Sequence, residues 1–220
     1  MTSDTEQQRA ELQAAGRYLI QHDLTWGNAG NLSARVAPDC ALITASGTRL
    51  GELGDEDLVE FPFSGPWAGT RRKPSKETPM HRAVYEARPE IGAVLHAAPF
   101  HATLLACTDL DIPADWFVEG MYYLERVARV PYFHPGAEAL GEAVGRVATT
   151  ANVLLLENHG VLVYDANVQE ALMALQTLEL TCRMVVTAHG GPLPIRPLDP
   201  GVVADFLNNA GYRPRRAWPS

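Results

Sequence analysis

The 220-residue sequence predicts an α/β fold with a central, largely antiparallel or mixed sheet covered by helices. The first observation is that strand-like segments often follow one another without a helix between them. The second is that amphipathic helical stretches lie before and between these groups. With 46% hydrophobic and 20% charged residues the chain can bury a sizeable core. We expect one domain over residues 1–220, with 191–220 as a C-terminal tail.

The first half of the chain predicts a helix, three strands and a second helix. Ser3 and Glu6 can form a capping box that opens the first helix. Short runs rich in branched apolar residues, bounded by turn residues, predict strands around 32–36, 40–44 and 58–61. Thr78 then caps a helix that has Pro79 at its first position and ends before Pro89.

The second half predicts a similar mixture. An apolar strand over 91–96 is followed by a helix soon after Pro99, a strand near 127–133 and a helix after Gly136. Two strands, 153–156 and 161–164, flank a tight turn. Asn167 is typical of a helix N-cap and opens a long helix.

Charge and composition narrow the function. A formal net charge of −8 and an isoelectric point near 5.3 disfavour nucleic acid as a ligand. No apolar run approaches the roughly 18 residues of a membrane helix. The polar, acidic N-terminus and the three scattered cysteines favour a cytoplasmic protein. A short basic patch (Arg213, Arg215 and Arg216) reads as a solvated tail or a subunit contact.

Three loops combine glycine with small polar side chains: residues 27–31, 44–47 and 74–76. Such loops can bind an anion through backbone N–H groups, although each alone is also typical of an ordinary turn. None matches the phosphate loop or the dinucleotide fingerprint. The only two lysines, Lys73 and Lys76, lie at the third loop, which favours a chemical role for an ammonium group there.

Several ionisable residues could carry chemistry. Glu77 precedes a helix, whose dipole favours a carboxylate. His96 ends an apolar strand, His159 lies in a turn between two strands, and His101 follows His96 closely. A single strand-end histidine is also typical of a structural residue. The other four histidines, 22, 81, 134 and 189, are interpreted as structural.

The order of these motifs resembles the class II aldolase/adducin family. The matching segments are GNAGNLS at 27–33, ITASG at 43–47, KPSKETPMHRAVYEARP at 73–89, AVLHAAPFHAT at 93–103, VPYFHPGAEAL at 130–140 and ENHGVLV at 157–163. The resemblance implies a three-layer α/β/α sandwich around a mainly antiparallel sheet. It also implies a homotetramer with sites between subunits.

The resemblance further implies roles for individual residues. In the family's aldolases three histidines bind a divalent metal, and His96 and His159 match the first and third of them. Glu77 matches an acid/base residue that can touch the metal. The residues that match the family's phosphate-binding site are Gly30, Asn31, Ser46, Gly47 and Ser75.

Two positions depart from the family pattern. Ala98 replaces the second histidine of the HxH motif, and Lys76 stands where sugar-phosphate enzymes of the family usually carry serine. Three alternatives could account for the missing histidine ligand. Glu77 can complete a two-histidine, one-carboxylate set that suits Fe(II), Mn or Zn. Alternatively His101 is the third ligand, or no metal is bound and Lys76 acts with Glu77 unaided.

The leading functional hypothesis is a lyase that cleaves or forms a C–C bond next to a carbonyl, as an aldolase or a decarboxylase. Its substrate is a small anion, and Lys76 favours one that carries a carboxylate. A non-heme iron oxygenase and a non-catalytic, adducin-like module are the alternatives, and an imine-forming aldolase through Lys76 is the remotest. We expect no nucleic-acid partner and no membrane.

Overall fold

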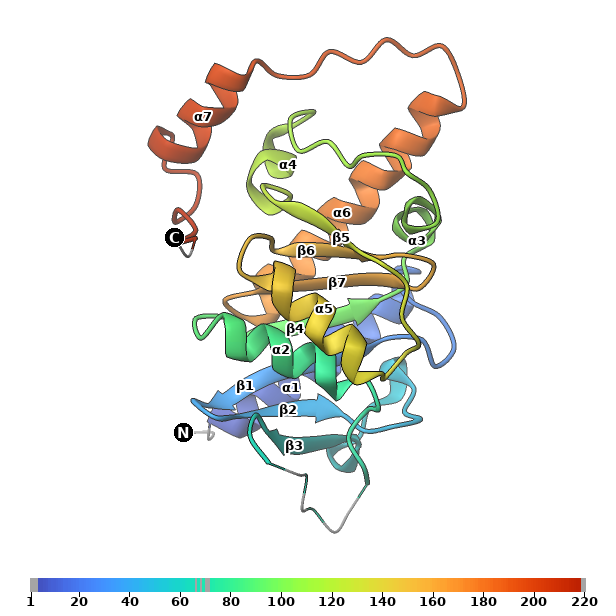
Figure 1. Cartoon of the computed structure of the whole chain (residues 1–220), viewed down its shortest axis with the longest axis vertical. Helices are drawn as coiled ribbons and strands as arrows, with labels where there is room; N and C mark the ends of the chain where they lie inside the picture. Colours follow the sequence, from blue (N-terminus) through green and yellow to red (C-terminus); the bar gives the residue numbers. More distant parts are fainter. Residues whose placement is uncertain (1–3, 66, 68, 70–71, 219–220) are drawn as a thin grey trace.

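The computed structural model describes residues 4–65, 67, 69 and 72–218, so the expected capping residue Ser3 lies outside the described residues. Within them, seven strands form one sheet in the order β3-β2-β1-β4-β7-β6-β5 (Figure 1). Neighbouring strands are antiparallel except β5 and β6, which are parallel. The expected α/β fold with a mainly antiparallel sheet is confirmed.

The elements follow the order that the sequence predicts. The strands are β1 (Asn31–Ala37), β2 (Cys40–Thr44), β3 (Leu58–Pro62), β4 (Ala93–Ala97), β5 (Val127–Val130), β6 (Val153–Leu156) and β7 (Gly160–Asp165). The α-helices are α1 (Asp4–Gln21), α2 (Thr78–Ala87), α3 (Phe100–Ala106), α4 (Val118–Tyr123), α5 (Glu138–Ala148), α6 (Val168–His189) and α7 (Pro200–Asn209).

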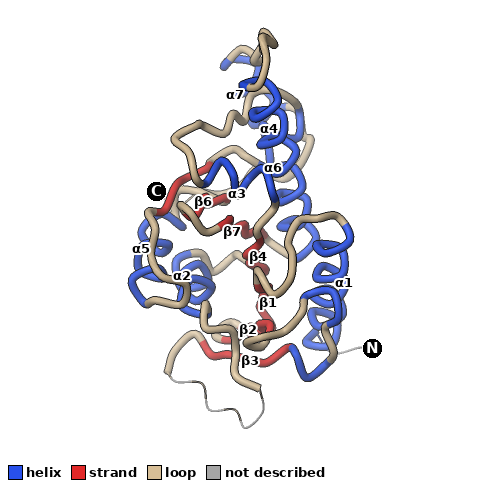
Figure 2. The backbone as a smooth tube through the Cα atoms, turned by 90° about the vertical axis from the view of Figure 1, so that its right-hand side faces the viewer, coloured by secondary structure: helices blue, strands red, loops and turns tan. Residues whose placement is uncertain are grey.

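Helices cover both faces of the sheet. Seen along its edge, the sheet has α2 and α5 on one side and α1 and α6 on the other (Figure 2). Alternation along β4 supplies both cores, because Val94 packs in the core under α2 and α5 while Leu95 packs in the core under α1 and α6. The resulting three layers match the expected sandwich.

The helix α6 is the one described helix that is long and apolar enough to cross a membrane by length and composition. Half of its most apolar window is buried inside the protein, against the sheet and α3. Its N-cap Asn167 accepts a hydrogen bond from the Glu170 backbone N–H, as the sequence predicts. We therefore describe α6 as a core helix.

Some boundaries differ from the expectation. The strand β5 ends at Val130, before Pro131, which lacks the N–H that a strand ladder requires. Glu77, rather than Thr78, occupies the N-cap position of α2, and Pro79 lies in its first turn. The short helix α4 and the tail helix α7 were not predicted.

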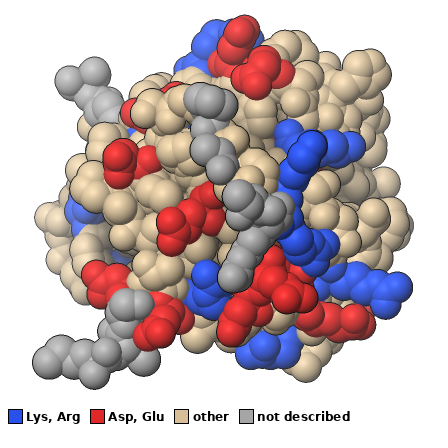
Figure 3. Space-filling model, turned by 90° about the horizontal axis from the view of Figure 1, so that it is seen from below, with Lys and Arg blue, Asp and Glu red and all other residues tan. Residues whose placement is uncertain are grey.

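Charged side chains of both signs lie close together on the face at the β3 end of the molecule (Figure 3). Two ion pairs of the described residues, Arg72 with Asp57 and Arg49 with Glu52, show the same mixing.

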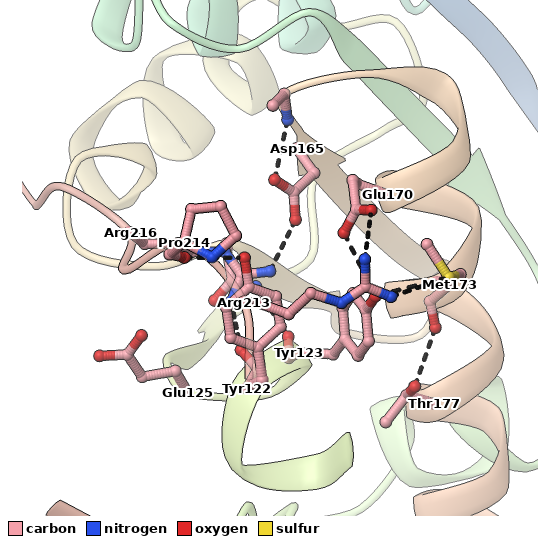
Figure 4. A network of polar contacts seen from close by, with 12 residues as sticks. Tyr122, Tyr123, Glu125, Asp165, Glu170, Met173, Thr177, Arg213, Pro214 and Arg216 are labelled. Atoms are coloured by element: carbon pink, nitrogen blue, oxygen red, sulfur yellow. Dashed lines mark hydrogen bonds and ion pairs between the residues drawn. The ribbon is translucent and has the colours of Figure 1, made fainter. Parts of the chain in front are cut away.

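The C-terminal segment after α7 folds back onto α4 and the end of β7 (Figure 4). Arg216 lies 2.6 Å from Asp165, donates to the Tyr122 carbonyl and stacks over the Tyr122 ring. Arg213 pairs with Glu170 at 3.3 Å. The basic patch is thus docked on its own chain, which the reading as a solvated tail did not anticipate.

Replacing Arg216 with Met should lower the free energy of unfolding, because both side chains of its pair with Asp165 are at least 90% buried. Removing one partner of a buried pair costs about 3 kcal/mol or more. The matched control is Arg49→Met, whose pair with Glu52 is exposed and contributes less than about 1 kcal/mol. Urea unfolding measures both variants. Equal effects of the two would contradict the prediction, and the double variant D165N/R216M should recover part of the loss.

Candidate active site

His96 is placed by the alternation of β4. It shares a sheet face with Val94, so its ring points toward the α2 side, and it is 3% exposed. Its Nδ1 lies 2.9 Å from the Val161 carbonyl, which can only accept, so Nδ1 carries the proton. The Nε2 lone pair is therefore free and faces Glu77.

Glu77 lies at the start of α2, over the end of β4. One carboxylate oxygen, Oε2, is 3.4 Å from His96 Nε2, and the other, Oε1, is 3.2 Å from His159 Nε2. One donor atom from each of the three residues lies within 4.8 Å of the others. The sequence-predicted residues Glu77, His96 and His159 thus converge.

His159 reaches the cluster from the turn between β6 and β7. Two glycines let the chain pass close to the end of β4. A Cβ at Gly160 would lie 2.7 Å from the Ala97 carbonyl oxygen, and a Cβ at Gly30 would lie 2.6 Å from the His96 carbonyl oxygen. Gly30 also has a φ of +84°, which disfavours any side chain. Both positions require glycine for His96 and His159 to meet.

The pKa values of the cluster residues favour binding of a cation. Burial raises the pKa of the Glu77 carboxyl, but the imidazoles of His159 and His96 and the amide of Asn31 outweigh it and lower the pKa to about 2. Burial lowers the pKa of His96, with the Glu77 charge opposing this effect. At neutral pH the group therefore offers an ionised carboxylate and a neutral imidazole.

The donor set fits a divalent cation. Glu77 Oε1 is buried and faces His159 Nε2 at 3.2 Å, and His159 Nδ1 is buried without a hydrogen-bond partner among the described residues. A buried carboxylate oxygen without a donor is costly unless a ligand completes it. Ala98 offers no third imidazole, so the set is two histidines and one carboxylate, which suits Fe(II), Mn or Zn.

His101 lies outside this cluster of Glu77, His96 and His159. It is the second residue of α3, and its Nδ1 is 2.7 Å from Glu179 Oε1 of α6. The same carboxylate accepts from the backbone N–H groups of His101 and Ala102, at the start of α3. The pair with Glu179 therefore holds the His101 ring against α6 and links the start of α3 to that helix.

Two of the three loops adjoin. The Ser46 backbone N–H donates to the Lys73 carbonyl, and the Ser75 N–H donates to the Thr44 carbonyl. This pairing places Ser46 and Gly47, both exposed, beside the segment that leads to Glu77. Lys76 is exposed as well.

Asn31, which the resemblance matches to the family's phosphate-binding site, has its side chain between two other protein groups. Its Nδ2 donates to Glu77 Oε2 at 2.7 Å, and its Oδ1 lies 2.6 Å from His81 Nε2. Both ends of the amide are therefore occupied by protein groups. His81, read from the sequence as structural, lies directly behind the cluster; the spacing of four residues between Glu77 and His81 was the signal for it.

Comparisons with known proteins agree with the fold and give the family. Residues 10–186 match the family described as the class II aldolase and adducin N-terminal domain. The 3-oxo-tetronate 4-phosphate decarboxylase of Haemophilus influenzae is 34% identical over 80% of this chain and 85% of its own. The methylthioribulose-1-phosphate dehydratase of Pseudomonas fluorescens is 30% identical over 81% of this chain and 92% of its own.

Solved structures give the same answer. YgbL from Klebsiella pneumoniae, for which an aldolase, epimerase or decarboxylase activity has been suggested, has a TM-score of 0.85 and 31% identity, covering 94% of this chain and 100% of its own. An L-fuculose 1-phosphate aldolase has a TM-score of 0.82 and 27% identity, covering 94% and 95%. Fold and site together define a lyase of the class II aldolase type. The chain belongs to the class II aldolase and adducin family.

Proposed function

We propose that this chain is a metal-assisted decarboxylase of a small phosphorylated 3-oxo acid. The observation that carries the proposal is the convergence of Glu77, His96 and His159 next to the adjoining loops at Ser46 and Ser75. The decarboxylase relatives, at 34% identity over 80% of the chain, support the substrate class. Lys76 supports it further, because an ammonium can bind the substrate carboxylate.

In the proposed reaction the bond between the carboxyl carbon and the neighbouring carbon breaks and the carboxyl group leaves as CO2. The electron pair moves onto the 3-oxo group, and the resulting enolate takes up a proton from solvent to give the ketone. Glu77, His96 and His159 would hold the divalent cation. When bound, the cation supplies Lewis-acid stabilisation of the charge that develops on the carbonyl oxygen. The hydroxyls of Ser46 and Ser75 and the backbone N–H groups of Gly30 and Gly47 bind the phosphate and orient the substrate.

The ionised Glu77 has a second role if the chain cleaves an aldol instead. Glu77 is ionised at neutral pH, so its carboxylate can accept the proton of a substrate hydroxyl. The fuculose phosphate aldolase neighbour favours this candidate. A decarboxylation needs no such proton removal, so comparing a 3-oxo acid with its hydroxy ketone counterpart separates the two reactions.

The donor set itself favours one other candidate, an iron oxygenase. Two histidines and a carboxylate with open positions are the ligands of non-heme Fe(II) oxygenases. Oxygen uptake by the Fe(II)-loaded protein in the presence of a 2-hydroxy or 3-oxo acid phosphate would support this candidate. Uptake equal to that of buffer would remove it.

Replacing Lys76 with Ser should lower kcat/KM for a phosphorylated 3-oxo acid by about 10- to 100-fold, because a charge-assisted contact to the carboxylate is lost. The thermal midpoint should not change, since Lys76 is exposed. Lys73→Ser is the matched control, an exposed lysine three positions away that should keep its activity. Release of CO2 measures the activity of both variants. Equal rates for the two variants would contradict the binding of the substrate carboxylate by Lys76.

We also propose that the protein is a cytoplasmic homotetramer with its sites between subunits, as the family resemblance implies. Partner side chains would then complete the pocket over the exposed Ser46 and Gly47. Light scattering on the eluted protein gives the mass of the assembly. A monomer with full activity would contradict the shared site.

A further inference from the structure

Behind the cluster lies a layer of five buried polar side chains joined from Glu77 to Tyr85. Asn31 Nδ2 lies 2.7 Å from Glu77 Oε2, and Asn31 Oδ1 lies 2.6 Å from His81 Nε2. His81 Nδ1 lies 2.7 Å from Ser33 Oγ, which is 2.9 Å from the Tyr85 hydroxyl. His81 and Ser33 are 0% exposed, and Tyr85 is 2% exposed. Solvent does not reach the middle of this network.

The spacing of the two elements makes the network possible. Glu77, His81 and Tyr85 are four residues apart along α2, a rise of about 6 Å per step. Asn31 and Ser33 are two residues apart on one face of β1, a rise of about 6.6 Å. The two repeats nearly match, so side chains from the helix and the strand alternate along one line of hydrogen bonds.

The direction of each hydrogen bond follows from the carboxylate. An ionised Glu77 only accepts, so Asn31 turns its NH2 group toward it and its Oδ1 toward His81. An oxygen there requires His81 to carry its proton on Nε2. Burial lowers the pKa of His81 to about 3, with the nearby His96 acting in the same direction, so the ring is neutral and Nδ1 accepts from Ser33.

We propose that His81 is a positioning residue that fixes the orientation of the Asn31 amide and, through it, the Glu77 carboxylate. The neutral Nε2–H tautomer holds Asn31 Oδ1, which keeps the NH2 group on Glu77 Oε2. The second oxygen, Oε1, receives no hydrogen bond from this network; it faces His159 Nε2 at 3.2 Å and is the one available to a cation. If the amide rotated, its oxygen would face the carboxylate and repel it. The inference rests on the proposed function only in that Glu77 holds a cation.

Two substitutions of His81 separate positioning from packing. Gln places an amide NH2 near the position of Nε2 and can keep the bond to Asn31, whereas Asn reaches only the position of Nδ1 and keeps the bond to Ser33. We expect Co²⁺ to bind H81N about 10- to 100-fold more weakly than wild type, the usual cost of losing an outer-shell partner, and H81Q to stay within about 3-fold. Calorimetric titration with Co²⁺ alone measures both.

The titration gives different results if the His81 proposal fails and if the proposed metal site fails. Equal weakening in H81Q and H81N, with equal loss of thermal midpoint, would mean that His81 only packs and would overturn the proposal. A wild-type protein that binds no Co²⁺ would instead overturn the metal site of the proposed function. The spectrum of bound Co²⁺ adds a second readout, because a displaced Glu77 changes the coordination in H81N and not in H81Q.

A measurement on the unaltered protein covers the case in which a variant does not fold. ¹⁵N chemical shifts of labelled histidine distinguish the two neutral tautomers, and the H81Q spectrum or a Ser33→Ala spectrum assigns the His81 signals. We expect a neutral ring with its proton on Nε2. A proton on Nδ1 would contradict the proposal, because such a ring cannot donate to Asn31 Oδ1.

Discussion

Replacing Glu77 with Gln should lower kcat/KM by about 1,000-fold or more, the range that loss of a charged group at the reacting centre usually costs. Gln keeps the size of the side chain and can still accept the hydrogen bond from Asn31. It removes the negative charge that lies 3.4 Å from His96 Nε2 and 3.2 Å from His159 Nε2. The variant should therefore fold normally and lose both cation affinity and turnover.

Glu86 is the matched control, since it lies on the same helix but is exposed. Glu86→Gln should keep the activity of the wild type. Steady-state rates with a phosphorylated 3-oxo acid and with a hydroxy ketone phosphate measure the two variants side by side. Full activity of E77Q in both assays would show that Glu77 has no role in catalysis, although the fold assignment would stand.

Removing divalent cations with a chelator should abolish turnover and lower the thermal midpoint, and adding back Zn²⁺, Mn²⁺ or Fe²⁺ should restore both. A ligand that binds only the folded state stabilises it by about 4 kcal/mol when present at 1,000 times its dissociation constant. The physical reason is the buried Glu77 Oε1, which gains its missing partner when a cation binds.

The variants His96→Ala and His159→Ala serve as controls for the chelator, because each removes one ligand and should make the thermal midpoint insensitive to cation. His134→Ala, at an exposed histidine, should respond like the wild type. Activity that survives exhaustive chelation would favour the third alternative, in which Lys76 and Glu77 act without a metal.

The convergence of three residues was predictable because each lies at a defined end of an element. His96 lies one residue before the end of a strand, His159 lies in a turn between strands, and Glu77 is the N-cap of a helix. Such ends meet at one edge of a layered fold. Their order in the sequence, with Ala98 in place of a histidine, made Glu77, His96 and His159 one of the ligand sets that the sequence left open. The fold followed from the same spacing of strands and helices.

Other features depend on partners far away in the sequence and were not predictable. His101 turns to Glu179, 78 residues later, and Arg216 turns to Asp165, 51 residues earlier. Asn31 matched a phosphate-binding position, but its amide is held by Glu77 and His81 from another element. In each case the sequence allows several partners for the side chain, and the packing of helices and strands determines which of them it contacts.

The close approach of the chain at Gly30 and Gly160 limits how this enzyme can be redesigned. A side chain at either position would collide with carbonyl oxygens at the end of β4 and push His96 away from its partners. A library aimed at new substrates should therefore hold both glycines fixed. Diversity belongs at Ser46 and Lys76, whose exposed side of the molecule can accept new groups while the backbone beneath the imidazoles stays in place.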